Sequence, residues 1–360
     1  MVLKKKTFSL LFLSLFLFSS ALGQRGIAKI AVIQASGFSV QDPFLDNYNP
    51  ALLRPQMTKH FNKLLGLFEE AGKMGADLVC GPEDMQHIGA YGLHIDKTNP
   101  ENGEILFNSL AVRVPGPVTN QVADIARRYK MYIIATIYEV ENGKIYNTAV
   151  VFDREGEIMG KHRKTLMPVM ETWLVSNGNE YEVFKTDFAE IAIAICWEIS
   201  YPEIASIYAL KGADIIFNPT MAKDNKPGQG LETAHMFITR AKDNSVYIAP
   251  VVLGQDGNGI IDFDGNVVAE AFGKKDAVIM TEIDFSKERI AKSDWWKIIN
   301  GTDNVRALHL KSRRPDINGI LTDPKPPLME RYKDVHLTTG DKERQLKAVR
   351  EVDYGPNSKK

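Results

Sequence analysis

The strongest constraint on the fold of this chain is a repeated alternation of short apolar runs with amphipathic segments. Apolar runs of strand length occur at residues 27–34, 76–80, 131–140, 191–197, 213–218, 245–253 and 277–283. Segments with apolar residues at helical spacing separate them, at 55–75, 118–129, 202–211 and 231–243. Strands that alternate with helices predict a layered α/β fold, and hairpins around 153–156 and 264–265 predict mixed sheets.

The first 23 residues have the parts of an export signal. Three lysines at positions 4–6 precede an apolar run at 8–18 that is too short to span a bilayer. Ala21 and Gly23 are the small residues expected before a cleavage site at Gln24. We therefore expect a periplasmic or secreted protein with no membrane span after signal removal, although a buried N-terminal helix is an alternative.

Composition limits the classes of partner. The chain has 360 residues with 44 Lys and Arg against 45 Asp and Glu, so no excess of basic charge indicates nucleic-acid binding. The seven histidines form no HExxH pair, so no metal site is predicted. Residues 311–360 are rich in charge and interrupted by prolines, which indicates a charged C-terminal tail after a domain spanning 24–310.

Polar residues with distinct chemistry stand at the ends of two predicted strands and between them. Glu83 follows the run at 76–80, Cys196 follows the apolar residues 191–195, and Lys164 ends a basic run. Side chains at the carboxyl ends of strands face the crevice where open α/β sheets bind ligands. Together they could form a nucleophilic site with a thiol, a proton acceptor and an oxyanion stabiliser. Spacing alone does not exclude that Cys196 is a core residue, that Glu83 is a solvated loop acid and that Lys164 is solvated.

These motifs resemble those of the nitrilase, or carbon–nitrogen hydrolase, superfamily. The similarity covers about residues 27–285 and includes GADLVCGPE at 75–83, GKHRK at 160–164, ICWE at 195–198, YPE at 201–203 and GADIIFNPT at 212–220. The resemblance implies a four-layer αββα sandwich with two mixed β-sheets. It also implies pairing into a homodimer or higher homo-oligomer through the outer helices, and no metal or organic cofactor.

The resemblance also implies roles for individual residues. Cys196 would be the nucleophile, Glu83 its general base, and Lys164 the proton donor and oxyanion stabiliser. Glu171 would orient Lys164 or the substrate, and the backbone N–H of Trp197 would be a second oxyanion contact.

Further residues are weaker candidates. The Cys196 thiol must be free to react, so no disulfide with Cys80 is expected, and Cys80 is predicted to lie in the core. The weaker candidates for substrate binding are Trp197, Tyr138, Asn218 and Thr220. Packing in the core is the alternative for the aromatic side chains.

The substrate class is less constrained than the family. The basic run and the Cys-Trp-Glu motif resemble true nitrilases, but Ile199 stands where they usually have Asn, Thr165 is inserted after Lys164, and Val169 replaces Thr. These departures favour an amidase or N-carbamoyl hydrolase that forms a cysteine thioester and releases a carboxylic acid with ammonia or an amine. A nitrilase is one alternative. An inactive binding or scaffold protein on the same fold is another, although Glu83, Lys164 and Cys196 are all present.

Overall fold

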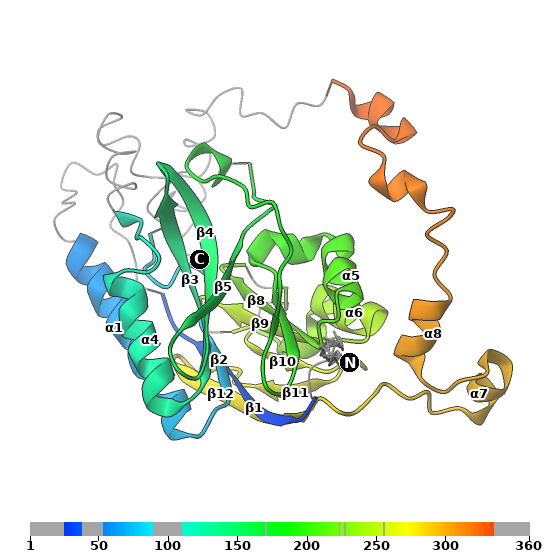
Figure 1. Cartoon of the computed structure of the whole chain (residues 1–360), viewed down its shortest axis with the longest axis horizontal. Helices are drawn as coiled ribbons and strands as arrows, with labels where there is room; N and C mark the ends of the chain where they lie inside the picture. The colour runs from blue at the N-terminus through cyan, green and yellow to red at the C-terminus, as the bar shows by residue number, and fades with distance from the viewer. Residues whose placement is uncertain are drawn as a thin grey trace, which may run out of the picture.

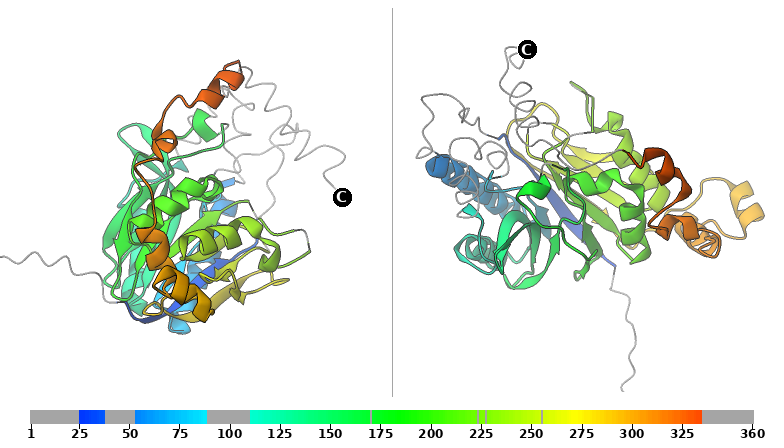
Figure 2. Two further views of the ribbon diagram at one scale, coloured as in Figure 1. Left: turned by 90° about the vertical axis from the view of Figure 1, so that its right-hand side faces the viewer. Right: turned by 90° about the horizontal axis from the view of Figure 1, so that it is seen from above.

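Two six-stranded sheets form the centre of the protein, and helices cover their outer faces (Figure 1). The computed structural model describes residues 25–37, 53–88, 110–169, 171–222, 224–226, 228–254 and 256–334. The predicted signal segment and the tail beyond residue 334 lie outside the described residues. The layers follow the order helix, sheet, sheet, helix, as the view from above in Figure 2 shows. The predicted four-layer αββα sandwich is therefore confirmed.

The first sheet has the strand order β12-β1-β2-β3-β4-β5. Its strands are β1 (Ile27–Gln34), β2 (Leu78–Cys80), β3 (Tyr132–Glu141), β4 (Lys144–Phe152), β5 (Ile158–Arg163) and β12 (Ala277–Asp284). The pairs β1–β2 and β2–β3 are parallel, and the others are antiparallel. Helices α1 (Leu53–Lys73) and α4 (Pro117–Tyr129) pack on its outer face.

The second sheet has the order β11-β10-β9-β8-β7-β6. Its strands are β6 (Val183–Lys185), β7 (Glu190–Ile193), β8 (Ile215–Thr220), β9 (Tyr247–Val252), β10 (Gly259–Ile261) and β11 (Val267–Glu270). Strands β7, β8 and β9 are parallel, and the outer pairs are antiparallel. Helices α5 (Pro202–Leu210) and α6 (His235–Asn244) cover its outer face.

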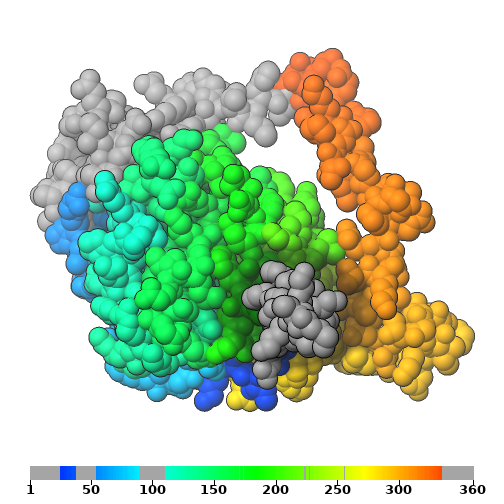
Figure 3. All heavy atoms as spheres, viewed as in Figure 1, coloured from blue at the N-terminus to red at the C-terminus, as the bar shows by residue number. Residues whose placement is uncertain are grey.

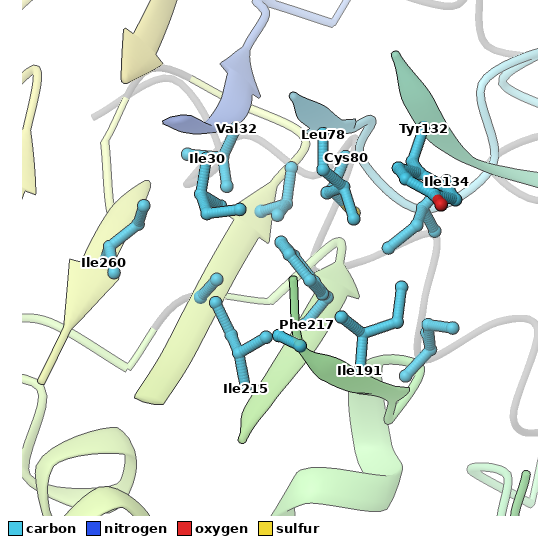
Figure 4. Packing of buried hydrophobic residues seen from close by; sticks show 14 of the residues in the cluster. Ile30, Val32, Leu78, Cys80, Tyr132, Ile134, Ile191, Ile215, Phe217 and Ile260 are labelled. Atoms are coloured by element: carbon cyan, nitrogen blue, oxygen red, sulfur yellow. The ribbon is translucent and has the colours of Figure 1, made fainter. Parts of the chain in front are cut away.

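An apolar core fills the space between the two sheets (Figure 4). In β1, Ile30 and Val32 point into this core, whereas Ala31 and Ile33 pack against the outer helix layer. This alternation follows from the two-residue period of a strand. Because both faces of the central strands are buried, these strands are apolar throughout rather than alternating with polar residues.

Three details differ from the sequence-based expectation. The strand predicted over 191–197 ends at Ile193, and Cys196 begins a 3₁₀ turn, η3 (Cys196–Ser200). The helix predicted over 231–243 is divided into a 3₁₀ turn, η4 (Leu231–Thr233), and α6. Strand β6 was not predicted, because three residues are too few to show a period.

After β12 the chain leaves the sandwich and extends along one side of it (Figures 1 and 3). This segment contains α7 (Asp294–Asn300), α8 (Val305–Lys311) and the 3₁₀ turns η5 (Gly319–Thr322) and η6 (Pro327–Tyr332). Arg306 of α8 holds it to the body through Asp214 (3.2 Å) and the carbonyl of Ala213 (2.8 Å). Almost all side chains from 311 to 334 are exposed. The domain boundary at residue 310 stays a prediction.

Candidate active site

Cys196 lies on a tight turn just beyond β7. Its φ of 49° is in the left-handed region, which a residue with a side chain adopts only when its surroundings hold it there. The Asn218 side chain at the end of β8 supplies part of that hold, because its Nδ2 donates to the carbonyls of Ala194 (2.5 Å) and Cys196 (3.2 Å). The turn presents the Cys196 side chain, partly buried, at the carboxyl edge of the second sheet.

Lys164 lies at the centre of a buried charged cluster. Its Nζ is 3.0 Å from Oε1 of Glu83 and 2.7 Å from Oε2 of Glu171. Asn147 bridges the same two carboxylates, because its Nδ2 donates to Oε1 of Glu83 and to Oε1 of Glu171, both at 2.9 Å. The second oxygen of Glu83 accepts the backbone N–H of Met221 at 2.9 Å. The structure thus brings three of the predicted catalytic residues into direct contact.

The strands of both sheets converge on this cluster. Glu83 follows β2, Asn147 lies in β4, and Lys164 follows β5, where its backbone N–H donates to the carbonyl of Asn147 at 2.9 Å. Glu171 begins the short 3₁₀ turn η2 (Glu171–Trp173). Met221 follows β8 of the second sheet. Residues from distant parts of the sequence therefore meet because the strands end at one edge of the sandwich.

The cluster keeps Lys164 charged. Burial alone would lower the pKa of its ammonium, but Glu83 and Glu171 outweigh that effect and hold the pKa above its usual value. Burial and the neighbouring Glu83 raise the pKa of the Glu171 carboxyl, against the opposing effects of Lys164 and Asn147. The ammonium is therefore a fixed positive charge at the site over the physiological pH range.

The Cys196 thiol has the opposite character. Burial raises its pKa to about 12 and Glu83 contributes to the increase, whereas Lys164, the Thr220 hydroxyl and the Met221 amide oppose it. The resting thiol is therefore protonated, and the charges of Glu83 and Lys164 both act on it. Cys80 is also a free thiol, and it is fully buried in the core between the sheets, as expected.

The weaker candidates lie in different surroundings. Thr220 is buried at the end of β8, beside Cys196. Tyr138 is buried, and burial together with Glu171 and other nearby acids raises the pKa of its phenol. The Trp197 side chain is 43% exposed, and its Nε1 donates to the Tyr201 hydroxyl at 3.3 Å. Tyr138 and Thr220 thus lie near the cluster, while the Trp197 side chain faces solvent.

Asn147 is the site residue that sequence reasoning missed. It lies in the middle of β4, whose other residues from 148 to 152 are almost all apolar and buried. A lone buried amide in such a strand is costly unless it is hydrogen-bonded, which is a signal for a polar cluster. The sequence alone does not reveal its partners, because Glu83 is 64 positions away.

Within the described ranges, no group of three or more His, Cys, Asp or Glu side chains is arranged to hold a metal ion. No helix in the same ranges is long and apolar enough to cross a membrane.

The resting Cys196 thiol is expected to stay protonated well above pH 8.5, which is about the usual pKa of a cysteine. The thiolate absorbance of the wild-type protein should therefore show no Cys196-dependent step between about pH 6 and pH 10, because burial and Glu83 disfavour the thiolate. Ultraviolet titration of the wild type against Cys196→Ala measures this. A step near 8.5 that disappears in the variant would contradict the geometry.

Comparison with known proteins places this arrangement in a family. The carbon-nitrogen hydrolase family model matches residues 29–292. The omega-amidase NIT2 of Xenopus tropicalis is 28% identical over 255 residues, which cover 65% of this chain and 86% of the relative. The bifunctional nitrilase/nitrile hydratase NIT4A of Lupinus angustifolius is 32% identical over 164 residues, 43% of this chain and 46% of the relative.

Solved structures share the fold at lower identity. Nit3 of Saccharomyces cerevisiae, a member of branch 10 of the nitrilase superfamily, superposes with a TM-score of 0.56 at 22% identity, covering 72% of this chain and 90% of that structure. A second structure is a mutant of the amidase from Nesterenkonia sp. AN1, with the acetamide moiety of fluoroacetamide added covalently at its active-site cysteine. It superposes with a TM-score of 0.58 at 16% identity, covering 83% of this chain and 98% of that structure. The family match over most of the chain and the shared sandwich confirm the resemblance of the motifs, and this chain belongs to the carbon–nitrogen hydrolase family of enzymes.

Proposed function

We propose that this enzyme hydrolyses the C–N bond of small amides or N-carbamoyl compounds, with Cys196 as nucleophile and Glu83 as general base. The observation that carries the proposal is the position of Cys196, on a strained turn within reach of the charges of Glu83 and Lys164. The omega-amidase relatives, which align over nearly two thirds of the chain, support an amide substrate.

The first step needs a base, because the pKa of the Cys196 thiol is about 12. Glu83 accepts the thiol proton as Sγ bonds to the carbonyl carbon, and the carbonyl oxygen becomes an oxyanion. The fixed charge of the Lys164 ammonium stabilises that oxyanion. Because the pKa of Lys164 is raised, its ammonium keeps its charge during the step. The thiol proton that Glu83 has accepted then passes to the leaving nitrogen, in place of the proton-donor role that the resemblance implies for Lys164.

The second half returns the enzyme to its starting state. The C–N bond breaks, ammonia or an amine leaves with the proton from Glu83, and a thioester remains on Cys196. Water then adds to the thioester carbon and gives a proton to Glu83. The C–S bond breaks, the sulfur regains that proton, and the carboxylic acid leaves. One amide and one water thus yield one acid and one amine.

Glu171 and Asn147 hold the reacting groups rather than react. Glu171 fixes the Lys164 ammonium together with Glu83, and Asn147 fixes both carboxylates. Two carboxylates this close repel each other, so the ammonium and the amide N–H groups between them are what allow both to stay in place.

A nitrile is the second candidate substrate. The nitrilase/nitrile hydratase of Lupinus angustifolius is 32% identical to this chain, against 28% for the omega-amidase of Xenopus tropicalis, although its similarity covers less than half of each chain. The same nucleophile could add to a nitrile carbon, and two waters would then give the acid and ammonia.

Substitution of the reacting groups tests the mechanism. Cys196→Ala is expected to abolish hydrolysis, and Lys164→Met to lower kcat by about 10²–10³-fold, since the oxyanion loses its counter-charge. Ammonia or amine release from aliphatic amides, carbamoyl amino acids and nitriles is the measurement. It also decides which substrate class is correct.

Cys80→Ala is the matched control, because it removes the other thiol and leaves the cluster intact. It should retain activity. Undiminished turnover by Cys196→Ala, with circular dichroism equal to that of the wild type, would contradict the proposal.

Export is a further part of the proposed function, and it rests on the three lysines, the apolar run and the small residues before Gln24. Protein recovered from the periplasm or the medium of an expressing bacterium should begin at Gln24. N-terminal sequencing of each cell fraction measures this. Protein confined to the cytoplasm with residues 1–23 intact would exclude export.

We also propose a homodimer or higher homo-oligomer. Large apolar side chains of the C-terminal segment are exposed, among them Trp295, Ile298 and Leu321, and Leu210 is exposed on α5. Exposed apolar surface of this extent is typical of a protein interface. Light scattering of the purified protein should therefore give at least twice the chain mass, and a monomer at micromolar concentration would contradict the proposal.

A further inference from the structure

A buried ion pair connects the strand that leads to Lys164 with the turn that carries Cys196. Nε2 of His162 lies 2.9 Å from Oε2 of Glu198, and both side chains are fully buried. His162 belongs to β5 and Glu198 to η3. Neither takes part in the proton and acyl transfers proposed above, so their burial as charged groups requires another explanation.

The Glu198 carboxylate binds backbone groups beside both reacting residues. Its Oε2 accepts the N–H of Ile195, the residue before Cys196, at 2.6 Å. Its Oε1 accepts the N–H and the Oγ1–H of Thr165, the residue after Lys164, at 2.8 and 2.6 Å. One side chain therefore holds the nucleophile turn and the end of β5 in a fixed relation.

His162 is held from two sides. Its Nδ1 lies 2.8 Å from Oε2 of Glu182, just before β6, and the Tyr208 hydroxyl of α5 lies 3.4 Å from the same nitrogen while donating to the carbonyl of Ile193 at 2.6 Å. Glu182, Glu198 and Tyr208 are the titratable groups that face it. Two ring nitrogens, each beside a carboxylate, fit an imidazolium with both N–H groups donating.

The charges of this group reinforce one another. Burial alone would lower the pKa of His162, but Glu198 and Glu182 raise it to about 9. Burial alone would raise the pKa of Glu198, but His162 and Thr165 lower it. Both partners are therefore ionised at neutral pH.

We propose that His162 and Glu198 are positioning residues that set the spacing between the Lys164 ammonium and the Cys196 thiol. The proposal rests on the function proposed above. Its basis is that the Glu198 carboxylate binds Thr165, the residue after Lys164, and Ile195, the residue before Cys196. A buried ion pair adds little stability over apolar packing, so stability alone does not account for this one.

Two substitutions at the same position separate positioning from packing. His162→Gln places an amide nitrogen near the Nε2 position, from which it can still donate to Glu198. His162→Asn places it near the Nδ1 position, from which it reaches only Glu182. We expect His162→Asn to lower kcat about 100-fold, the loss typical of about 1 Å of misplacement, and His162→Gln to lower it about tenfold or less. KM should change less than about threefold in both variants, since the substrate contacts remain.

Glu182→Gln is the matched control on the other side of the ring. Its amide oxygen can still accept from Nδ1, and Glu182 is more exposed than Glu198. This variant should keep kcat within about threefold of the wild type. A loss as large as that of His162→Asn would show that the link to Glu198 has no special role.

The pH dependence of kcat tests the charge of His162, because a role in packing alone would not make kcat depend on that charge. In the folded protein the pKa of His162 is about 9, above the usual 6.5. The ion pairs of its imidazolium with Glu198 and Glu182 therefore contribute fully below about pH 6.5 and are lost as pH rises through about 9. The kcat of the wild type should fall over that upper range, while the Cys196 thiol, with a pKa of about 12, is still protonated. His162→Gln, which has no charge to lose, should show no such fall.

Alkylation of Cys196 by iodoacetamide, followed by mass spectrometry, separates this inference from the proposed function because it needs no substrate. Slower alkylation in His162→Asn than in His162→Gln, at equal melting temperature, supports positioning even if no amide is hydrolysed. Equal alkylation and equal kcat in the two variants would overturn it, even if the wild type hydrolyses amides. If His162→Asn does not fold, Thr165→Val removes the Oγ1 contacts with Glu198 and with the Tyr181 hydroxyl and keeps the backbone contact with Glu198, whereas Thr165→Ser keeps all three. We expect Thr165→Val to lower kcat about tenfold relative to Thr165→Ser, and no difference would overturn the proposal.

Discussion

The buried ammonium of Lys164 is the interaction on which the rest of the structure depends. A charge removed from water is tolerated only when opposite charges and hydrogen bonds surround it, and Lys164 is 1% exposed between Glu83 and Glu171. Glu83 in turn is held by the backbone N–H of Met221, which directly follows β8 of the other sheet. The charge is therefore stable only where the edges of both sheets meet, and this ties the site to the two-sheet architecture.

The apolar core between the sheets keeps that meeting point rigid. Val32 and Ile134 of the first sheet and Phe217 of the second lie in one buried cluster, and Cys196 packs against it. Close packing of this kind resists small displacements. The strands therefore hold the ends that carry Glu83, Asn147 and the Cys196 turn at fixed separations, while the charges gather at the edge.

Local patterns predict most of the strands and a layered α/β fold, because buried strands are apolar over their whole length, whereas the order of the four layers is implied by the resemblance of the motifs to a family. They do not predict where β7 ends, since the residues from 191 to 195 are apolar without interruption. The chain turns at Cys196 because Asn218 and Glu198 bind the backbone around it, and these are contacts made in the folded state. The Glu–Lys–Cys set could be identified from motifs, whereas Asn147 and His162 could not, because only the fold supplies their partners.

The electrostatics of the site suit a nucleophile that is neutral at rest and charged only during the reaction. Glu83 raises the pKa of the Cys196 thiol, and Lys164 lowers it. In the proposed reaction Glu83 accepts the thiol proton and loses its own negative charge, so its opposition to the thiolate ends at the moment the thiolate forms. Lys164 keeps its charge, and Glu171 continues to hold it. Glu83, which helps to keep the thiol protonated before substrate arrives, thus stops opposing the anion once it has taken the proton, and Lys164 continues to favour the anion.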